Sequence, residues 1–285
     1  DELNVTPGAI SQQIRTLEDF IGVPVFRRQK RGLTLTEEAQ ASLPILRDGF
    51  DKLATAASLL AASGANSGQL TVSVAPSFAS KWLVPRLDSF QATTPESHVY
   101  VQADMAVVDF AADNVDVAIR YGPGQYEGMT AIKLMEEKII PVCAPSLIRG
   151  EPPLKSLSDL AHHTLLHDGS HDQSDDAPTW AMWLRAAGAS DAKGQPRGGT
   201  RGPRFNQSSL AIEAAVAGKG VTLAKYALAL SDLEAARLVI PFDLSTPTDF
   251  AYYRVFPPAK IALPPVKAFV EWVQAEAESA ALAQG

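Results

Sequence analysis

The spacing of apolar residues changes along the chain, and each spacing predicts a different kind of structure. Near the N-terminus, Ile10, Ile14 and Leu17 are four and three residues apart, which places them on one face of a helix. Between residues 43 and 60 a similar spacing continues as a narrow seam. From residue 69 onward, short apolar runs alternate with helical patterns, which is typical of a parallel α/β sheet.

The N-terminal helix also carries a polar face. Thr6 is a good N-cap, and Pro7 then occupies the first helical position, where its missing N–H costs nothing. Small, hydrogen-bonding and cationic residues share the polar face, namely Gly8, Ser11, Gln12 and Arg15. Such a face suits the major groove of DNA. Because residues 1–4 resemble the end of an earlier helix, we predict a helix-turn-helix.

A basic segment follows this helix. Arg27 and Arg28 can pair with residues 33–35 as a short hairpin, whose tip carries Lys30 and Arg31. Cations at a hairpin tip would contact DNA phosphates and add affinity without reading the base sequence. The alternative interpretation of this basic run is a solvated loop.

A long helix is predicted next, capped by Thr36. Its apolar seam consists of Leu43, Leu46, Phe50, Leu53, Ala57 and Leu60. We interpret the seam as one half of a dimerising helix pair, although a helix packed on its own domain would show a similar pattern. Pro44 is expected to bend or interrupt the helix, and the Ser- and Gly-rich residues 63–68 are expected to end it as a hinge.

The remainder of the chain predicts two α/β lobes. Strands are expected at residues 70–75, 98–103 and 115–120, and in a second run at 164–167, 221–224 and 238–241. Helices are expected at 78–91 and 265–283, with crossing segments between the lobes at 139–144 and 250–256. This pattern is typical of a periplasmic-binding-protein-like architecture. In open α/β sheets, ligands bind beyond the carboxyl ends of the strands, where helices begin.

Three pairs of residues meet that description, namely Ser77 with Phe78, Ser208 with Ser209, and Arg120 with Tyr121. The serines would either bind a ligand or only cap their helices. Arg120 would either clamp a carboxylate through two parallel hydrogen bonds or lie on the surface. We therefore hypothesise a small carboxylated or otherwise anionic effector.

Three sequence segments occur in order near the N-terminus, namely VTPGAISQQIRTLE, IGVPVFRR and GLTLTEEA. Together they resemble the LysR-type family of bacterial transcriptional regulators, and in particular its glycine-cleavage and β-lactamase regulator branch. The resemblance implies a winged helix-turn-helix at 1–35, a linker helix at 36–64, a hinge at 65–68 and an effector-binding domain at 69–285. It also implies an additional helix before Asp1, so a chain that begins at Asp1 is expected to bind DNA poorly.

We place lobe 1 of the effector-binding domain at residues 69–140 and 247–285, and lobe 2 at 141–246. The resemblance favours ligand contact for Ser77 and Ser208 and adds Tyr252, although Tyr253 could equally face the cleft. The family pattern implies a homotetramer, a dimer of dimers, whose effector alters DNA bending. The expected partners are double-stranded DNA, the effector, the chain itself and, for an activator, RNA polymerase.

The composition narrows the function classes. The net charge of −7 over 285 residues argues against a protein that coats nucleic acid indiscriminately, but it permits a small basic reader attached to an acidic domain. Cys143 is the single cysteine, which excludes an internal disulfide and fits the cytoplasm, and we interpret it as a small buried apolar residue. No signal peptide and no apolar run long enough to span a bilayer are found, so no membrane partner is expected.

Some patterns favour other chemistry only weakly. Four histidines lie beside Asp168 and Asp172, namely His162, His163, His167 and His171, but they lack a recognised metal-ligand spacing and no metal is expected. Trp180 and Trp183 are interpreted as core residues. Without a phosphate-binding loop, a dinucleotide fingerprint or a nucleophile elbow, neither a cofactor nor catalysis is expected. The competing functions are a solute-binding protein with an incidental N-terminal extension and an enzyme, such as a transferase, on the same two-lobed scaffold.

Overall fold

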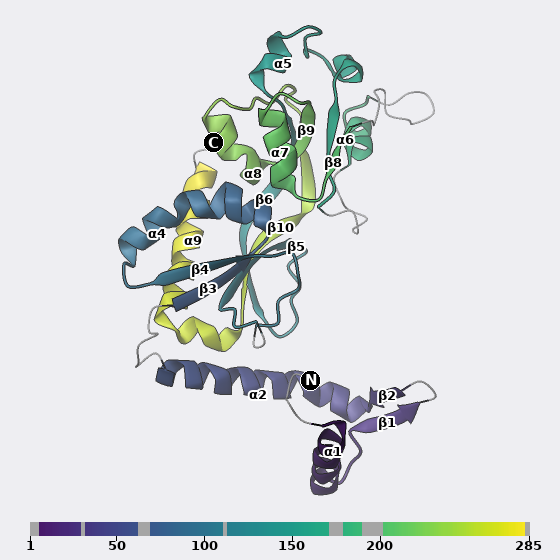
Figure 1. The fold of residues 1–285 in the computed structure, drawn as a ribbon, viewed down its shortest axis with the longest axis vertical. Helices are drawn as coiled ribbons and strands as arrows, with labels where there is room; N and C mark the ends of the chain where they lie inside the picture. The colour runs from purple at the N-terminus through teal and green to yellow at the C-terminus, as the bar shows by residue number, and fades with distance from the viewer. Residues whose placement is uncertain are drawn as a thin grey trace. The chain divides into compact units, whose positions relative to one another are not determined.

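The computed structural model describes residues 6–29, 32–61, 69–110, 113–170, 179–189 and 202–282. The chain folds into two compact units, Asp1–Leu60 and Ala61–Gly285, and each is described by itself (Figure 1). Predictions about Lys30, Arg31, the hinge and the segment before Thr6 fall outside the described residues. No helix in the described part of the chain is long and apolar enough to cross a membrane.

Helix α1 (Pro7–Ile21) has a cap at each end. The Thr6 hydroxyl accepts a hydrogen bond from the N–H of Ala9 at 3.3 Å, which confirms the predicted N-cap. At the other end, Gly22 has a φ of 76° and its N–H donates to the carbonyl of Glu18 at 2.8 Å. Only glycine adopts this left-handed conformation without strain, so the helix ends there.

The basic segment forms the predicted hairpin. Strand β1 (Phe26–Gln29) pairs antiparallel with β2 (Gly32–Leu35), and Arg28 lies opposite Leu33. Successive side chains along each of these strands point to opposite faces of the hairpin. Helix α1 and the β1–β2 hairpin are therefore arranged in the chain order of the recognition helix and wing of a winged helix-turn-helix.

Two side chains fix the base of the hairpin to the helices on either side. The Glu18 carboxylate accepts a hydrogen bond from the N–H of Val25 at 2.7 Å. The Thr36 hydroxyl donates to the carbonyl of Pro24 at 3.1 Å and accepts from the N–H of Ala39 at 3.3 Å. Thr36 is buried, so the residue predicted only as a helix cap also anchors the hairpin.

Helix α2 (Glu37–Ala61) runs without a break through Pro44, so the expected interruption of the helix at this proline is wrong, whereas a bend there stays a prediction. A proline removes one backbone donor, and the other hydrogen bonds of this 25-residue helix are sufficient to continue it. The side chains of the predicted seam are largely exposed in the unit, with Leu46 at 55%, Phe50 at 71% and Leu53 at 67%. The seam is therefore available to a partner.

The second unit is built on one sheet with the strand order β4-β3-β5-β10-β6-β9-β7-β8. In chain order, the strands are β3 (Gln69–Val74), β4 (His98–Ala103), β5 (Val117–Gly122), β6 (Thr130–Val142), β7 (Leu165–Asp168), β8 (Arg204–Phe205), β9 (Val221–Lys225) and β10 (Thr246–Phe256). Strands β4, β3 and β5 are parallel, and so are β8, β7 and β9. The sheet therefore has two parallel halves, as predicted.

The long strands β6 and β10 connect the two halves. They are antiparallel to each other, and β10 pairs with β5 while β6 pairs with β9. The predicted crossing segments at 139–144 and 250–256 covered only one end of each strand. The predicted strand at 238–241 is wrong, because Val239 forms only an isolated bridge with Cys143 and Pro241 cannot donate to a ladder.

Helices cover both halves of the sheet (Figure 1). The segment after β3 is helical throughout but changes type, as α3 (Pro76–Phe78), a π-helix (Ala79–Leu83), a 3-10 helix (Val84–Arg86) and α4 (Leu87–Thr93). The other α-helices are α5 (Pro145–Arg149), α6 (Trp180–Ala186), α7 (Ser208–Val216), α8 (Tyr226–Glu234) and α9 (Pro264–Leu282), and two further 3-10 helices span Leu157–His162 and Pro258–Ala262. As predicted, the C-terminal helix returns to the first half, where it contacts β3 and β6.

The buried apolar residues form separate clusters. The largest includes Val72 and Phe269, and a second includes Trp180, Trp183 and Cys143. Both tryptophans and Cys143 are buried, which confirms their interpretation as core residues. Burial raises the pKa of the Cys143 thiol to about 11, so the thiol remains protonated and apolar in character at neutral pH.

Candidate functional site

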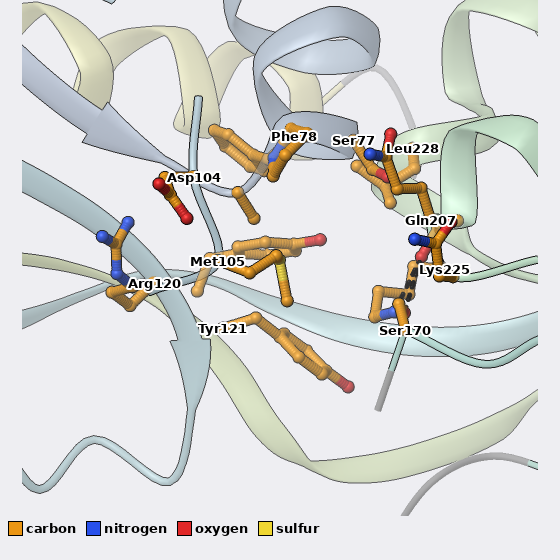
Figure 2. Close-up of a pocket in the computed structure, with 15 residues that line it drawn as sticks. Ser77, Phe78, Asp104, Met105, Arg120, Tyr121, Ser170, Gln207, Lys225 and Leu228 are labelled. Atoms are coloured by element: carbon orange, nitrogen blue, oxygen red, sulfur yellow. Dashed lines mark hydrogen bonds between the residues drawn. The ribbon is translucent and has the colours of Figure 1, made fainter. Parts of the chain in front are cut away.

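A cavity of about 220 Å³, called here the interlobe cavity, lies between the two halves of the second unit (Figure 2). Most of its lining follows the carboxyl ends of parallel strands, namely Ala75, Pro76, Ser77 and Phe78 after β3, Asp104 and Met105 after β4, Ser170 after β7, and Asn206, Gln207 and Ser208 after β8. Arg120, Tyr121, Lys225, Leu228 and Tyr252 complete the wall. This is the position at which open α/β sheets bind ligands.

Two serines join the halves at one edge of the interlobe cavity. The Ser77 hydroxyl donates to Oγ of Ser209 at 3.3 Å and accepts from the N–H of Ser209 at 2.9 Å. Ser77 is the second residue of the helical segment after β3, and Ser209 lies in the first turn of α7. The starts of two helices are therefore in direct contact across the cavity edge.

A buried ion pair anchors the second half. Lys225 Nζ lies 3.6 Å from Asp168 Oδ2, and both side chains are less than one-tenth exposed. Ser208 donates to the same carboxylate oxygen at 2.5 Å and accepts from Lys225 at 3.2 Å, while the N–H of Ser170 donates to Asp168 Oδ1 at 2.9 Å. Burial alone would raise the pKa of Asp168, but the Lys225 charge and these hydrogen bonds hold it below its ordinary value. Asp168 is therefore ionised at neutral pH.

Aromatic rings form another wall of the interlobe cavity. The Tyr252 ring centroid is 4.6 Å from that of Phe78 and 5.1 Å from that of Tyr121. The Tyr121 hydroxyl is hydrogen-bonded to Thr248 Oγ1 at 3.0 Å. Burial raises the pKa of Tyr121 to about 12 and that of Tyr252 well above its ordinary value. Both phenols therefore remain neutral near pH 7.

The Arg120 guanidinium already has protein acceptors. One terminal nitrogen donates to the carbonyls of Ser73 at 3.0 Å and Ile119 at 3.1 Å, and the other donates to Ser73 Oγ at 2.7 Å and the carbonyl of Ala106 at 3.4 Å. Burial lowers the pKa of Arg120, which nevertheless remains a cation at neutral pH. Figure 2 shows Arg120 near Asp104, away from Lys225 and Ser170. A ligand carboxylate bound to the two terminal nitrogens would have to replace some of these four contacts.

Glu137 on β6 is a buried carboxyl group close to the ion pair. Its oxygens accept a hydrogen bond from the N–H of Ala227 at 3.3 Å, at the start of α8. Burial raises the pKa of Glu137 to about 7, against the lowering effects of backbone hydrogen bonds and the Lys225 charge. The charge of this group therefore changes near neutral pH.

The polar face of α1 is open to solvent in the first unit. The four residues predicted for this face are exposed, namely Gly8, Ser11, Gln12 and Arg15, and so are Thr6 and Pro7 at the start of the helix, which are further candidates for DNA contact. Ser11 donates its hydroxyl hydrogen to the carbonyl of Pro7 at 2.9 Å, and Thr6 serves as the cap, so both hydroxyls also have structural roles. Arg27 on the hairpin is exposed as well.

Comparisons with known families agree with this geometry. Residues 1–40 match the bacterial regulatory helix-turn-helix protein, lysR family, and residues 63–278 match the LysR substrate binding domain. The chain belongs to the LysR family of bacterial transcriptional regulators. It is a DNA-binding regulator with a domain that senses a small molecule.

Curated relatives of this LysR-type regulator cover most of its length. It is 43% identical over 277 residues to the glycine cleavage system transcriptional activator of Escherichia coli K12, an alignment that covers 97% of this chain and 87% of the relative. It is 36% identical over 247 residues to the HTH-type transcriptional activator AmpR of Pseudomonas aeruginosa, which covers 87% of this chain and 79% of AmpR. Both belong to the branch that the sequence segments indicated.

Solved structures show the same fold. The effector domain of AmpR from Pseudomonas aeruginosa matches with a TM-score of 0.61 and 30% identity, over 76% of this chain and 98% of that domain. CrgA, a LysR-type regulator from Neisseria meningitidis, matches with a TM-score of 0.58 and 21% identity, over 97% of this chain and 91% of CrgA. The two-part architecture is therefore that of the family.

The structure brings the predicted effector residues of this regulator together. Ser77, Phe78, Arg120, Tyr121, Ser208 and Tyr252 line the interlobe cavity, and Ser209 touches Ser77. Of the two adjacent tyrosines, Tyr252 lines the cavity, whereas the Tyr253 ring packs 6.2 Å from that of Tyr126 in a different cluster. Neighbouring residues on a strand face opposite sides, so only one of the pair can line the cavity.

The sequence interpretation missed the cation and carboxylate that hold Ser208. Lys225 is the last residue of the buried strand β9, and Asp168 is the last residue of β7. A charged residue directly after an apolar run, at a strand end that faces a ligand cleft, was the signal that could have identified both. Asp168 instead appeared only as a neighbour of the histidine group.

The histidine group does not form a metal site in the described part of the chain. Among those residues, no three His, Cys, Asp or Glu side chains are grouped closely enough to hold a metal ion. Asp168 is engaged by Lys225 and Ser208, and His171 and Asp172 lie outside the described residues.

Proposed function

We propose that this LysR-type regulator binds double-stranded DNA through α1 and the β1–β2 hairpin, and that a small anionic effector binds in the interlobe cavity to control transcription. The observation that carries the effector class is the concentration of hydrogen-bond donors in that cavity. Both parts rest on residues that the family profile covers.

Hydrogen-bond donors are numerous along the cavity wall, and the Asp104 carboxylate, which also lines it, already accepts from the N–H of Ala106 at 2.8 Å. The donors are the hydroxyls of Ser77, Ser170 and the two neutral tyrosines Tyr121 and Tyr252, the side-chain amides of Asn206 and Gln207, and the cations Arg120 and Lys225. The nearby Asp168 carboxylate already accepts hydrogen bonds from Ser208 and Ser170. A ligand carboxylate, which only accepts hydrogen bonds, complements such a wall.

The start of α7 adds to the preference for an anion. This nine-residue helix begins at Ser208, and the backbone N–H groups of its first turn carry a partial positive charge. Ser208 and Gln207 at this end line the cavity. A carboxylate held near them would interact favourably with the helix dipole.

The DNA part of the proposal rests on the exposure and shape of the first unit. Gly8, Ser11, Gln12 and Arg15 form an exposed stripe, in which the small Gly8 and Ser11 let the helix approach base edges and the longer Gln12 and Arg15 can bond to them. Arg27, and by prediction Arg28, Lys30 and Arg31, would contact phosphates from the hairpin. Glu18 holds the hairpin against α1, so the two contacting surfaces keep a fixed spacing.

The exposed seam of α2 supports self-association. Leu46, Phe50 and Leu53 present apolar surface at coiled-coil spacing, which a second copy of the helix would cover. We propose a dimer through this seam, assembled further into a tetramer, that acts in the cytoplasm and that contacts RNA polymerase if it activates transcription. No catalytic step is assigned to the cavity, because Ser208 accepts from an ion-paired ammonium group and so has no neutral base beside it.

Fluorescence anisotropy tests the DNA part. The DNA upstream of the regulator's own gene is titrated with wild type and Arg15→Ala at two salt concentrations. We expect salt-sensitive binding that weakens by about 1–3 kcal/mol in Arg15→Ala. Lys52→Ala is the matched control, because it removes an exposed cation from α2 that pairs with Asp48. Equal binding to random DNA, or equal losses in both variants, would refute the assignment of α1.

Calorimetry tests the effector part with matched pairs of small carboxylic acids and their primary amides. The acids are expected to bind and the amides to bind at least about tenfold more weakly, because the wall offers donors. Ser77→Ala should weaken the acids by a similar factor. Ser80→Ala, an exposed neighbour on the same helical segment, should not. If only neutral or cationic compounds bind, the proposal of an anionic effector is refuted.

A further inference from the structure

A second pocket of about 110 Å³, called here the α6 pocket, lies between the start of α6 and strands β6 and β10. None of its lining residues belongs to the wall of the interlobe cavity. The hydroxyl of Tyr121, a residue of the interlobe cavity, is hydrogen-bonded to Oγ1 of Thr248, a residue of the α6 pocket, at 3.0 Å.

An irregularity in β10 shapes this pocket. Pro247 pairs with Lys138 and Ala251 pairs with Glu136, so residues 248–250 lie opposite a single residue of β6. Extra residues on one strand leave the ladder and bulge out of it. Two of them, Thr248 and Asp249, line the pocket instead of continuing regular pairing.

Trp183 lines this pocket, and its indole carries a buried donor that has no partner among the described residues. Its side chain lines the pocket and is 2% exposed, and its indole N–H donates to no atom of the described residues. The indoles of two other tryptophans are bonded, Trp180 to the carbonyl of Leu166 at 2.9 Å and Trp272 to Ser89 Oγ at 2.8 Å. Leaving a buried donor unpaired is costly, and an acceptor placed in the adjoining space would remove that cost.

The other walls define what kind of molecule could supply the acceptor. Ile139, Met182 and Pro247 are apolar, and the exposed Asp249 carboxylate disfavours a negatively charged ligand. The volume accommodates only a small molecule. We propose that the α6 pocket is a second ligand site, which takes a small neutral molecule whose carbonyl, sulfoxide or similar oxygen accepts the Trp183 indole N–H. This site is independent of the anionic effector assigned to the interlobe cavity.

Indole resonances provide a direct test in the full chain. Protein labelled with ¹⁵N-tryptophan gives one indole signal for each of its four tryptophans, assigned by single Trp→Phe variants. Titration with N-methylacetamide or dimethyl sulfoxide is expected to shift the Trp183 signal to saturation. The Trp180 and Trp272 signals should stay in place, because their N–H groups already have acceptors.

A second measurement tests whether the same small molecules bind when the indole of Trp183 is removed. The methyl signal of Met182, which lines the pocket, reports N-methylacetamide binding to Trp183→Phe. The dissociation constant is expected to rise about tenfold in Trp183→Phe, because one hydrogen bond is lost, and to stay unchanged in Trp272→Phe. The proposal would be overturned by a Trp183 signal that does not move, by shifts of all the indole signals that do not saturate, or by equal affinity of wild type and Trp183→Phe. A Trp183 signal that does not move would leave a bound water as the partner of its N–H.

Discussion

The two units of this regulator bury their apolar side chains to very different extents. In the first unit, α1 has no buried residue, and Phe20 and Phe50 are 87% and 71% exposed. In the second unit, Val72 and Phe269 are completely buried. Large exposed apolar side chains mark surfaces that a partner covers. We infer that the second unit is stable through its own core, whereas the stability of the first unit depends on association.

The largest expected effect tests that contrast directly. Phe269→Ala should lower the free energy of unfolding of the second unit by about 3–5 kcal/mol, because it leaves a cavity under α9. Phe50→Ala removes the same aromatic ring from α2 and should change that free energy by less than about 0.5 kcal/mol. Urea unfolding followed by tryptophan fluorescence reports the second unit, since all four tryptophans lie there. Analytical ultracentrifugation should show weaker self-association for Phe50→Ala but not for Phe269→Ala. Equal losses of unfolding free energy in the two variants would contradict the proposed difference between the units.

The ion pair is expected to give the next largest effect. Lys225→Met should destabilise the second unit by about 3 kcal/mol near pH 7, because it leaves the Asp168 carboxylate buried without its cation. Adding Asp168→Asn should recover part of that loss. Lys133→Met is the matched control, since its partner Glu136 is exposed, and it should have little effect in the same urea unfolding experiment. A loss as small as that of the control would show that Lys225 does not stabilise Asp168.

Glu137 should make the stability of the second unit depend on pH. Its pKa is about 7 in the folded chain, above the ordinary value of 4.5, so folding favours the protonated form. Its contribution should therefore fall by about 3 kcal/mol as the pH rises from 4.5 to 7, and should change little above pH 7. Glu137→Gln should remove this slope while still accepting the hydrogen bond from Ala227. Identical pH profiles of wild type and variant in urea unfolding would rule the effect out.

The smallest expected effect concerns the start of α1. Thr6→Ala should destabilise the first turn of this helix by about 1 kcal/mol, because one backbone N–H loses its acceptor. Hydrogen exchange of the amides of α1 measures the loss locally. Thr16→Ala is the control, since the Thr16 hydroxyl only donates to the carbonyl of Gln12 within the helix. Comparable increases of exchange in both variants would mean that Thr6 does not act as a cap.

Local signals predicted many of the elements correctly. Thr6 and Thr36 cap their helices, β4 spans the predicted residues, and the serines after β3 and β8 line the interlobe cavity. The interruption expected at Pro44 does not occur, because the effect of one proline has to be weighed against the hydrogen bonds of the whole helix. The strand predicted at 238–241 failed because strand pairing depends on a partner with free backbone groups, which an apolar run does not reveal.

The sequence by itself determined the family, the two parallel halves of the sheet and the positions at which ligand-binding residues follow strands, because caps, periodicity and motifs act over a few neighbouring residues. Tertiary structure alone decided that Tyr252 lines the cavity, that Lys225 meets Asp168, and that Trp183 adjoins a second pocket. These contacts join residues far apart in the chain, and their geometry depends on strand order and on the bulge in β10. Such contacts leave no local pattern, since each partner alone is an ordinary polar residue at a strand end or an aromatic residue in a core.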